Sequence, residues 1–571
     1  MRESRAIIVG LVVICLLMLC PRSQKFPELR ERLIEHSQTE LSGSYTRHEP
    51  ISVSNDSGFS SQGWPGEGSL EDPYVIADLN ITNASISISI VNTTAHFEIS
   101  NCRISSTAYT PNDGILFRNV THGKVRDCII SHHGHGIKIS SSRNINLESN
   151  TVHHNLDSGL YLVSSVYCTL SSNCAFSNSL EDYQAAGGFF IVECNKTVLS
   201  KNVAYENNGR GYLIRYSYGC KLAHNTAHGN DLSGFFLYVS ETCLLRSNTA
   251  SNNSVDDFYS IGGFRLLGSK HCLLENNTSS KNHGNGFLLA YGENATVADN
   301  TARDNKVGFN LDFFDDTRIV NNTAFGNSDG FTISFSDYMQ VTGNTGSNNS
   351  ETGFLLTSSS LCVFFRNTAI GNELGVALEG SCEDNILYEN RLGYNEETNG
   401  LDNSWTNAWD NGASGNYWSD YDGSDQYIIP GSANNTDRHP HLLDLLHPRI
   451  DHPSDVIIIA YTPGENITWN PSDRNPYSFE VYQNGILIQS GYWNGSRILT
   501  DISEIDSGVY NFTLVVYDKT LNSVSDTVIV EVRPNPIDAI LPGIVIVLGV
   551  AVTFVIIQEC REFVIDEQGG S

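Results

Sequence analysis

The sequence contains a phrase that returns about every 23 residues, and this internal period constrains the fold more than any other feature. The phrase centres on Asn-Thr-Ala, and its first Asn recurs at intervals of 22, 23 or 29 residues between Asn150 and Asn390. A second Asn follows each of these eleven residues five positions later, from Asn155 to Asn395. One unit of this length cannot bury its apolar side alone, so the sequence predicts stacked units around a continuous core.

Apolar residues within each unit follow a period of two. A glycine precedes two apolar residues that are separated by one position, as in Phe235/Leu237 and Phe331/Ile333. This period predicts β-strands, and no unit carries a helical pattern. The predicted fold class is therefore all-β: a right-handed parallel β-helix with coils of 22–23 residues, roughly 14 coils in number, whose equivalent side chains stack about 4.8 Å apart.

The recurring Asn residues have a structural interpretation in such a stack. An inward Asn at a bend can bond to the backbone and to the amides of neighbouring coils, so each column is predicted to form a ladder. Five cysteines that precede the key Asn by five positions are interpreted as buried apolar fillers. They are Cys168, Cys220, Cys243, Cys272 and Cys362.

The chain ends and the changes of pattern predict the domain organisation. An uncharged run at Ala6–Cys20 suits a signal sequence, and Ala539–Gln558 has the length of a membrane span. We expect a signal peptide or signal anchor at 1–24, a linker with a short helix at 25–50, the β-helix at 51–441, a linker at 442–453, an immunoglobulin-like β-sandwich at 454–534, a transmembrane helix at 537–558 and a cytoplasmic tail at 559–571. These segments predict a cell-surface protein, anchored in the plasma membrane with its bulk extracellular.

The sandwich is predicted from six short strands between Val456 and Val532. Asp506-Ser-Gly-Val-Tyr510 has the form of a tyrosine corner, and Trp469 is a candidate core tryptophan. Sequons for N-glycosylation agree with export. The predicted sites are Asn80, Asn92, Asn119, Asn195, Asn294, Asn466, Asn494 and Asn511. With 64 acidic and 34 basic residues, the formal charge of −30 is a poor match for nucleic-acid phosphate, so we expect no nucleic-acid partner.

Three motifs carry a resemblance to a known family. They are the run from Trp64 to Ile76, GNYWSDY at Gly415–Tyr421 and DRHP at Asp437–Pro440. With the coils, they resemble the NosD-like, or carbohydrate-binding and sugar-hydrolase (CASH), β-helix family, of the archaeal surface-protein type. The resemblance covers about Ile51–His441 and implies carbohydrate as the leading ligand class, with copper handling as another role.

The middle coils carry apolar residues where outward positions should be polar. Phe190, Leu213, Phe236 and Tyr238 are the predicted ligand-binding residues of this strip. A strand that is apolar on both faces is covered on both, so the strip is predicted to dock another segment, such as Phe26–His36, or a partner.

Three other sets of residues are candidate sites. Asp312, Asp315, Asp316 and Arg318 are candidate catalytic residues of a polysaccharide lyase, with carboxylates for calcium and a basic group nearby. Two six-residue insertions bring Glu181, Asp182, Asp256 and Asp257, which are candidate calcium ligands. Imidazoles brought together by stacking could bind copper or zinc, at His132, His133, His135, His153 and His154.

The function predicted from these features is recognition or structure. We expect a non-catalytic, membrane-anchored β-helix that binds carbohydrate or a surface protein. The alternatives are a polysaccharide lyase or glycoside hydrolase and, second, copper binding in a NosD-like role.

Overall fold

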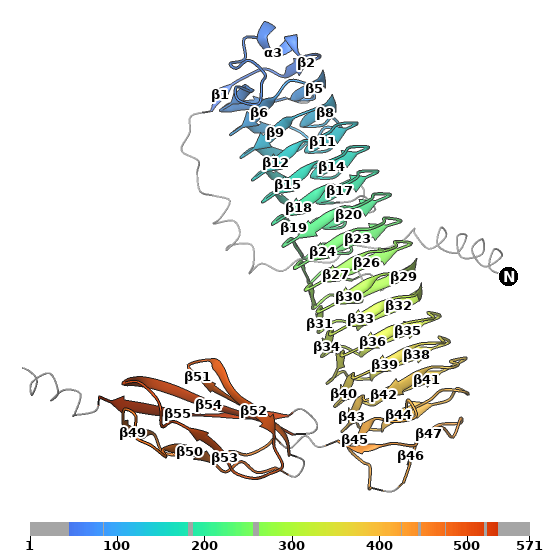
Figure 1. The fold of residues 1–571 in the computed structure, drawn as a ribbon. Helices are drawn as coiled ribbons and strands as arrows, with labels where there is room; N and C mark the ends of the chain where they lie inside the picture. The colour runs from blue at the N-terminus through green and yellow to red at the C-terminus, as the bar shows by residue number, and fades with distance from the viewer. Residues whose placement is uncertain are drawn as a thin grey trace, which may run out of the picture. The chain divides into compact units, whose positions relative to one another are not determined.

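The computed structural model describes residues 45–534, except 84, 181–186, 255–261, 424, 444–446, 474–475 and 519–521. The chain divides into two compact units, Met1–Leu442 and Leu443–Ser571. The first contains the β-helix and the second a smaller group of strands (Figure 1).

The first unit is a right-handed β-solenoid of about 15 turns, one more than predicted. Each regular turn adds one strand to each of three parallel sheets, which contain 17, 15 and 14 strands and are called sheets A, B and C. Sheet A runs from β1 (Thr46–Arg47) to β48 (His441–Leu442), and sheet C from β3 (Tyr74–Ala77) to β42 (Ile386–Tyr388).

Sheet B carries the predicted apolar strip on three of its strands. Its strands are β2 (Ile51–Val53), β5 (Ile88–Thr93), β8 (Ile115–Val120), β11 (Ile137–Ser140), β14 (Leu160–Val163), β17 (Phe189–Val192), β20 (Tyr212–Arg215), β23 (Phe235–Tyr238), β26 (Phe264–Leu267), β29 (Phe287–Glu293), β32 (Val307–Asp315), β35 (Asp329–Ser334), β38 (Thr352–Thr357), β41 (Leu374–Glu379) and β44 (Thr398–Asp402). Neighbours in this order pair in parallel along the solenoid (Figure 1).

Inward positions of sheet B form a stack of aromatic rings through the core. Eight rings on successive coils, from Phe189 to Phe354, lie 4.6–4.8 Å apart between centroids. Their planes are within 7° of parallel. The strand spacing of a parallel sheet sets this distance, because each ring sits on its counterpart one coil away.

Both columns of Asn form ladders, which confirms the prediction made from the repeat. Asn225 is representative: its Nδ2 donates to the Leu199 carbonyl at 2.9 Å and to Asn248 Oδ1 at 3.0 Å, and its backbone N–H donates to the same Oδ1 at 3.0 Å. The second column repeats this pattern from Asn155 to Asn395. The ladders satisfy backbone groups at two corners of every regular coil. The five predicted filler cysteines are buried free thiols.

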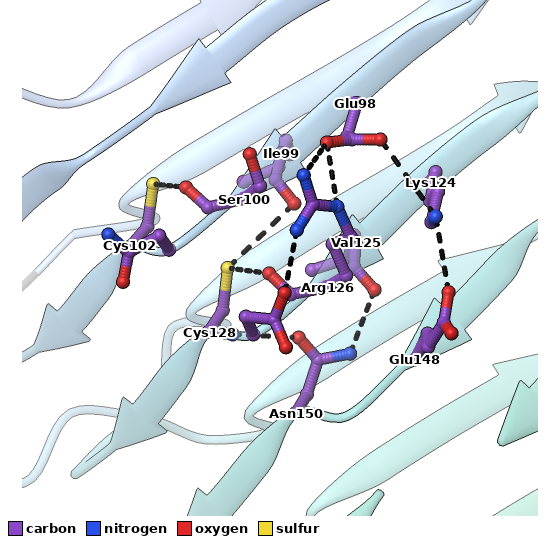
Figure 2. A network of polar contacts seen from close by, with 12 residues as sticks. Glu98, Ile99, Ser100, Cys102, Lys124, Val125, Arg126, Cys128, Glu148 and Asn150 are labelled. Carbon is purple, nitrogen blue, oxygen red and sulfur yellow. Dashed lines mark hydrogen bonds and ion pairs between the residues drawn. The ribbon is translucent and has the colours of Figure 1, made fainter. Parts of the chain in front are cut away.

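In each column, the coil before the first Asn has a different residue at the ladder position. Figure 2 shows Cys128 above Asn150, with the Cys128 N–H donating to Asn150 Oδ1 at 3.1 Å and Asn150 Nδ2 donating to the Val125 carbonyl at 2.9 Å. The same view shows ion pairs across the outer face of sheet C, where Lys124 lies 3.1 Å from Glu148 and 3.9 Å from Glu98. Above the second ladder, the His133 N–H donates to Asn155 Oδ1 at 3.0 Å.

The buried position of His133 at the start of the second ladder can be tested by the pH dependence of stability. The imidazole is fully buried, and this burial is the main cause that lowers the pKa of His133 to about 4. An unfolded histidine takes up its proton near pH 6.5, so acidification between about pH 6.5 and 4 favours the unfolded state. We therefore expect the melting temperature of His133→Asn to fall less than that of wild type when the pH is lowered from 7.5 to 5. This range covers about half of the window in which the unfolded histidine takes up its proton.

The matched control for this prediction is the exposed His283→Asn, which should leave the pH dependence unchanged. An equal loss of midpoint in wild type and His133→Asn would contradict the assignment.

The two C-terminal motifs close the solenoid. Asn416 continues the first ladder, and Asp437 ends it by accepting hydrogen bonds from the Asn416 N–H at 2.7 Å and from Trp418 Nε1 at 2.9 Å. A Cβ on Gly415 would lie 1.8 Å from the Asp437 carboxylate, so this position requires glycine. Arg438 pairs with Asp410 at 2.6 Å. GNYWSDY and DRHP therefore form a cap, in which these side chains bond to one another.

The second unit contains two small sheets around their own core. Strands β49 (Val456–Ile459), β55 (Ser523–Arg533), β54 (Gly508–Asp518), β51 (Pro476–Gln483) and β52 (Ile486–Tyr492) form one sheet, and β50 (Asn466–Trp469) pairs with β53 (Ile498–Asp501). Trp469 is fully buried, and the Tyr510 hydroxyl donates to the Asp506 carbonyl at 3.1 Å, as a tyrosine corner requires. The immunoglobulin-like assignment stays a prediction.

The predicted fold class was wrong to include a transmembrane helix. No helix in the described part of the chain is long and apolar enough to cross a membrane, and the helix found there, α3 (Ser57–Ser61), has five residues. Residues 1–44 and 537–558, on which the signal, short-helix and membrane predictions fell, lie outside the described residues.

Candidate functional site

The predicted apolar strip lies on the outer face of sheet B. Leu213 and Phe236 form a cluster separate from the main core, with Phe190, Tyr238 and Leu267 packed against it. The strand register explains the cluster, because Phe190, Leu213 and Phe236 are direct partners on β17, β20 and β23. Leu213 and Phe236 are only 6% and 7% exposed, so they support this face and do not present an open apolar surface.

Arginine side chains lie against this cluster. The guanidinium carbons of Arg265 and Arg210 lie 4.8 and 5.0 Å from the centroid of the Phe236 ring. Arg215 lies 4.7 Å from the Tyr216 ring and 5.4 Å from the Tyr238 ring. Such cation–π contacts hold a guanidinium flat on a ring and orient it. We call Phe190, Leu213, Phe236, Tyr238, Leu267, Arg215 and Arg265 the arginine face.

Two of these arginines lack an acidic partner. Within the described residues, no carboxylate lies within ion-pair distance of Arg215 or Arg265, and the Nε atom of each is buried without a hydrogen bond. Burial lowers the pKa of Arg265, although a guanidinium stays charged in proteins. Two guanidinium groups without an acidic partner among the described residues therefore lie on one face of a chain whose formal charge is −30.

The arginines were missed at the level of sequence. The alternation of the strands could have predicted their outward position. Arg265 follows the inward Phe264, and Arg215 follows the inward Ile214, so both point outward. The ligand-binding role of Phe190, Leu213, Phe236 and Tyr238 stays a prediction. The strip was predicted to dock another segment, such as Phe26–His36, or a partner, and Phe26–His36 lies outside the described residues.

The candidate catalytic residues do not converge on one point. Asp312 lies on the outer face of β32 in sheet B, whereas Arg318 begins β33 (Arg318–Val320) in sheet C. Asp315 Oδ1 accepts a hydrogen bond from the Asp337 N–H at 2.9 Å, and Asp316 occupies the turn with φ of 52°. A corner of the solenoid therefore separates the acids from the predicted base.

The five histidines separate into three places. His133 points into the ladder column, and His135 packs against Tyr161 at 4.6 Å between ring centroids. His153 and His154 meet through their Nδ1 atoms at 2.9 Å, with the His132 ring 6.0 Å from His154. Burial lowers the pKa of His135 to about 3 and of His153 to about 4. In the described chain, no group of three His, Cys, Asp or Glu residues is arranged to hold a metal ion.

The candidate calcium ligands and the predicted glycosylation sites are the two remaining sets of predicted residues. Glu181, Asp182, Asp256 and Asp257, the candidate calcium ligands, lie outside the described residues. Seven of the eight predicted glycosylation sites are exposed, and Asn80 is half-buried. Exposure is a requirement for modification and does not test it.

Comparison with known proteins identifies two family models. Residues 259–423 match the model described as periplasmic copper-binding protein (NosD), and residues 66–191 and 113–263 match the one described as right handed beta helix region. The predicted resemblance to a NosD-like β-helix is thereby confirmed, whereas the archaeal surface-protein type is not tested. No curated protein matches the chain.

Solved structures with a similar fold include two alginate-modifying enzymes. The A-module of mannuronan C-5 epimerase AlgE6 from Azotobacter vinelandii is 15% identical, with a TM-score of 0.36, over 61% of this chain and 91% of that chain. The periplasmic alginate epimerase AlgG is 13% identical, with a TM-score of 0.37, over 74% of this chain and 98% of that chain. At these values the similarity carries no information about function.

Copper does not fit the residues within the NosD match. The five candidate histidines all precede residue 259, where that match begins. The described part of the match contains no three-residue metal-ligating group. No step of the account below therefore involves copper.

Proposed function

We propose that this NosD-like β-helix protein binds an acidic polysaccharide outside the cytoplasm, through the arginine face of sheet B. The observation that carries the proposal is the pair of partly buried guanidinium groups of Arg215 and Arg265, which are held against aromatic rings and have no acidic partner within the described residues. Planar guanidinium groups bind carboxylates through two parallel hydrogen bonds, which suits the acidic sugars of such a polymer.

The shape of the face supports a polymeric ligand. Outward residues of β17, β20, β23 and β26 repeat at the strand spacing, so the four strands span about 14 Å along the solenoid. Tyr216 is 44% exposed beside Arg215, and its ring can pack against the apolar face of a sugar. A ligand that extends along the solenoid axis can use several coils at once, which a small anion cannot.

The test is retention of the full-length protein on immobilised polysaccharides. We expect retention on polygalacturonate or alginate and none on dextran, and we expect salt to weaken retention between about 0.05 and 0.5 M because it screens exposed charges. Equal retention on the neutral and acidic polymers, or retention that salt does not change, would contradict the proposal. New reducing or unsaturated ends in the same incubations would indicate the enzymatic alternative.

A further inference from the structure

The outer face of sheet B changes character directly beyond the arginine face. Along one column the partners run Phe236, Arg265, Leu288, Asn310 and Thr332. Along the next column Asp312 pairs with Ser334, between Ala290 on one side and Thr357 on the other. We call Asn310, Asp312, Thr332 and Ser334 the polar floor.

Two groups of the polar floor have no partner among the described residues. Thr332 Oγ1 is buried and makes no hydrogen bond to them. Within the described residues, the Asp312 carboxylate has neither a hydrogen bond nor an ion pair, and burial raises its pKa. Buried polar groups without partners cost free energy. Hydroxyl groups of a ligand would lower this cost by forming hydrogen bonds with the polar floor.

Three aromatic side chains stand beside this floor on successive coils. Tyr291, Phe313 and Phe335 are 45%, 39% and 48% exposed. Their rings are parallel within 7°, with centroids 5.3 and 4.7 Å apart. Asp312 lies close enough to Tyr291 to raise its pKa, together with burial, which is the larger cause. We call these three residues the aromatic wall.

The fold does not require aromatic residues in this column. All three have positive φ, at 56°, 51° and 50°, which is unfavourable for bulky side chains. Other coils place Ser164, Ser358 or Gly380 at the same corner, with φ of 48°, 48° and 70°. Exposed rings in a strained conformation, where serine is tolerated, indicate a contact with something outside the chain.

We propose that the polar floor and the aromatic wall form a second subsite, which binds a neutral sugar ring of the same polysaccharide. The inference rests on the proposed function, because it assigns a further sugar to that ligand. The Asp312 carboxylate would repel an acidic sugar, whereas neutral hydroxyls can bond to Asp312 and Thr332. Arg265 and Asn310 lie two coils apart, about 10 Å, so one extended chain reaches both subsites.

The test is titration of the full-length protein with cellohexaose, mannohexaose and xylohexaose. We expect at least one of them to bind, and we expect Phe313→Ser/Phe335→Ser to weaken that binding about tenfold or more, as the loss of two stacking rings implies. The matched control is Phe325→Ser, which removes a 38% exposed ring from β34 (Thr323–Phe325) in sheet A and should bind normally.

Three results would overturn the second subsite. They are no binding of any hexasaccharide, equal binding by the double phenylalanine variant, and a wild-type dimer that the same variant converts to monomer. The last result would identify the aromatic wall as a self-association surface. If the wild-type protein is retained on acidic polysaccharides but binds no hexasaccharide, only this inference is overturned. If the wild-type protein is not retained on acidic polysaccharides, the proposed function is overturned.

Discussion

Asn248→Ala is expected to lower the free energy of unfolding by about 4 kcal/mol, because it leaves two buried backbone groups unpaired in the middle of a ladder. The Asn248 side chain donates to the Leu222 carbonyl at 2.9 Å and accepts from the Asn225 N–H at 3.0 Å. Alanine offers neither bond and water does not reach the site, since Asn248 is 1% exposed. Urea denaturation followed by circular dichroism measures the change.

The control for the ladder is Asn208→Ala, two coils away. Asn208 is half-buried and the structure records no hydrogen bond for its side chain within the described residues. We expect its cost to stay below about 1 kcal/mol, as for an ordinary surface substitution. Equal costs at Asn208 and Asn248 would mean that the ladder hydrogen bonds do not stabilise the solenoid.

Arg215→Gln/Arg265→Gln is expected to weaken binding of polygalacturonate about 100-fold, since two charge-assisted hydrogen bonds are worth about 3 kcal/mol or more. Glutamine keeps part of the side-chain length but removes the charge and the planar fork of donors. Neither arginine has an acidic partner among the described residues, so the double variant should fold with an unchanged melting temperature. Biolayer interferometry on immobilised polymer measures the affinity.

A matched pair of arginines separates this effect from net charge. Arg246 and Arg366 are exposed and pair with Glu275 at 2.6 Å and Glu389 at 2.8 Å. Arg246→Gln/Arg366→Gln removes the same two charges and should bind within about twofold of wild type, as exposed ion pairs contribute little. A similar loss in both double variants would show that binding depends on overall charge and not on the arginine face.

The solenoid could be predicted because its stabilising contacts repeat with the coil. An apolar residue two positions from another, or an Asn five from another, recurs in every coil, and each makes the same contact with its counterpart. The strand alternation also placed Leu213 and Phe236 on the outer face. Their burial beneath neighbouring side chains was not predictable, since it depends on where the long arginine side chains lie.

The histidines and acids show where sequence proximity misleads. His132 and His133 are adjacent, yet one lies at the corner near His154 and the other points into the ladder column. The spacing of 22 residues between His133 and Asn155 already implies the inward position. Asp312 and Arg318 are six residues apart, but a corner of the solenoid lies between them, so closeness along the chain did not bring them to one site.

Hydroxyl-radical footprinting of the full-length protein, with and without polygalacturonate, tests the central claim most directly. The account predicts that the polymer protects two tyrosines from oxidation: Tyr238 on the arginine face and Tyr216 beside Arg215. Labelling of Tyr461 and Tyr492 in the second unit, which are 58% and 70% exposed, should not change. Unchanged oxidation of Tyr216 and Tyr238 at saturating polymer, or protection confined to sheets A and C, would contradict it.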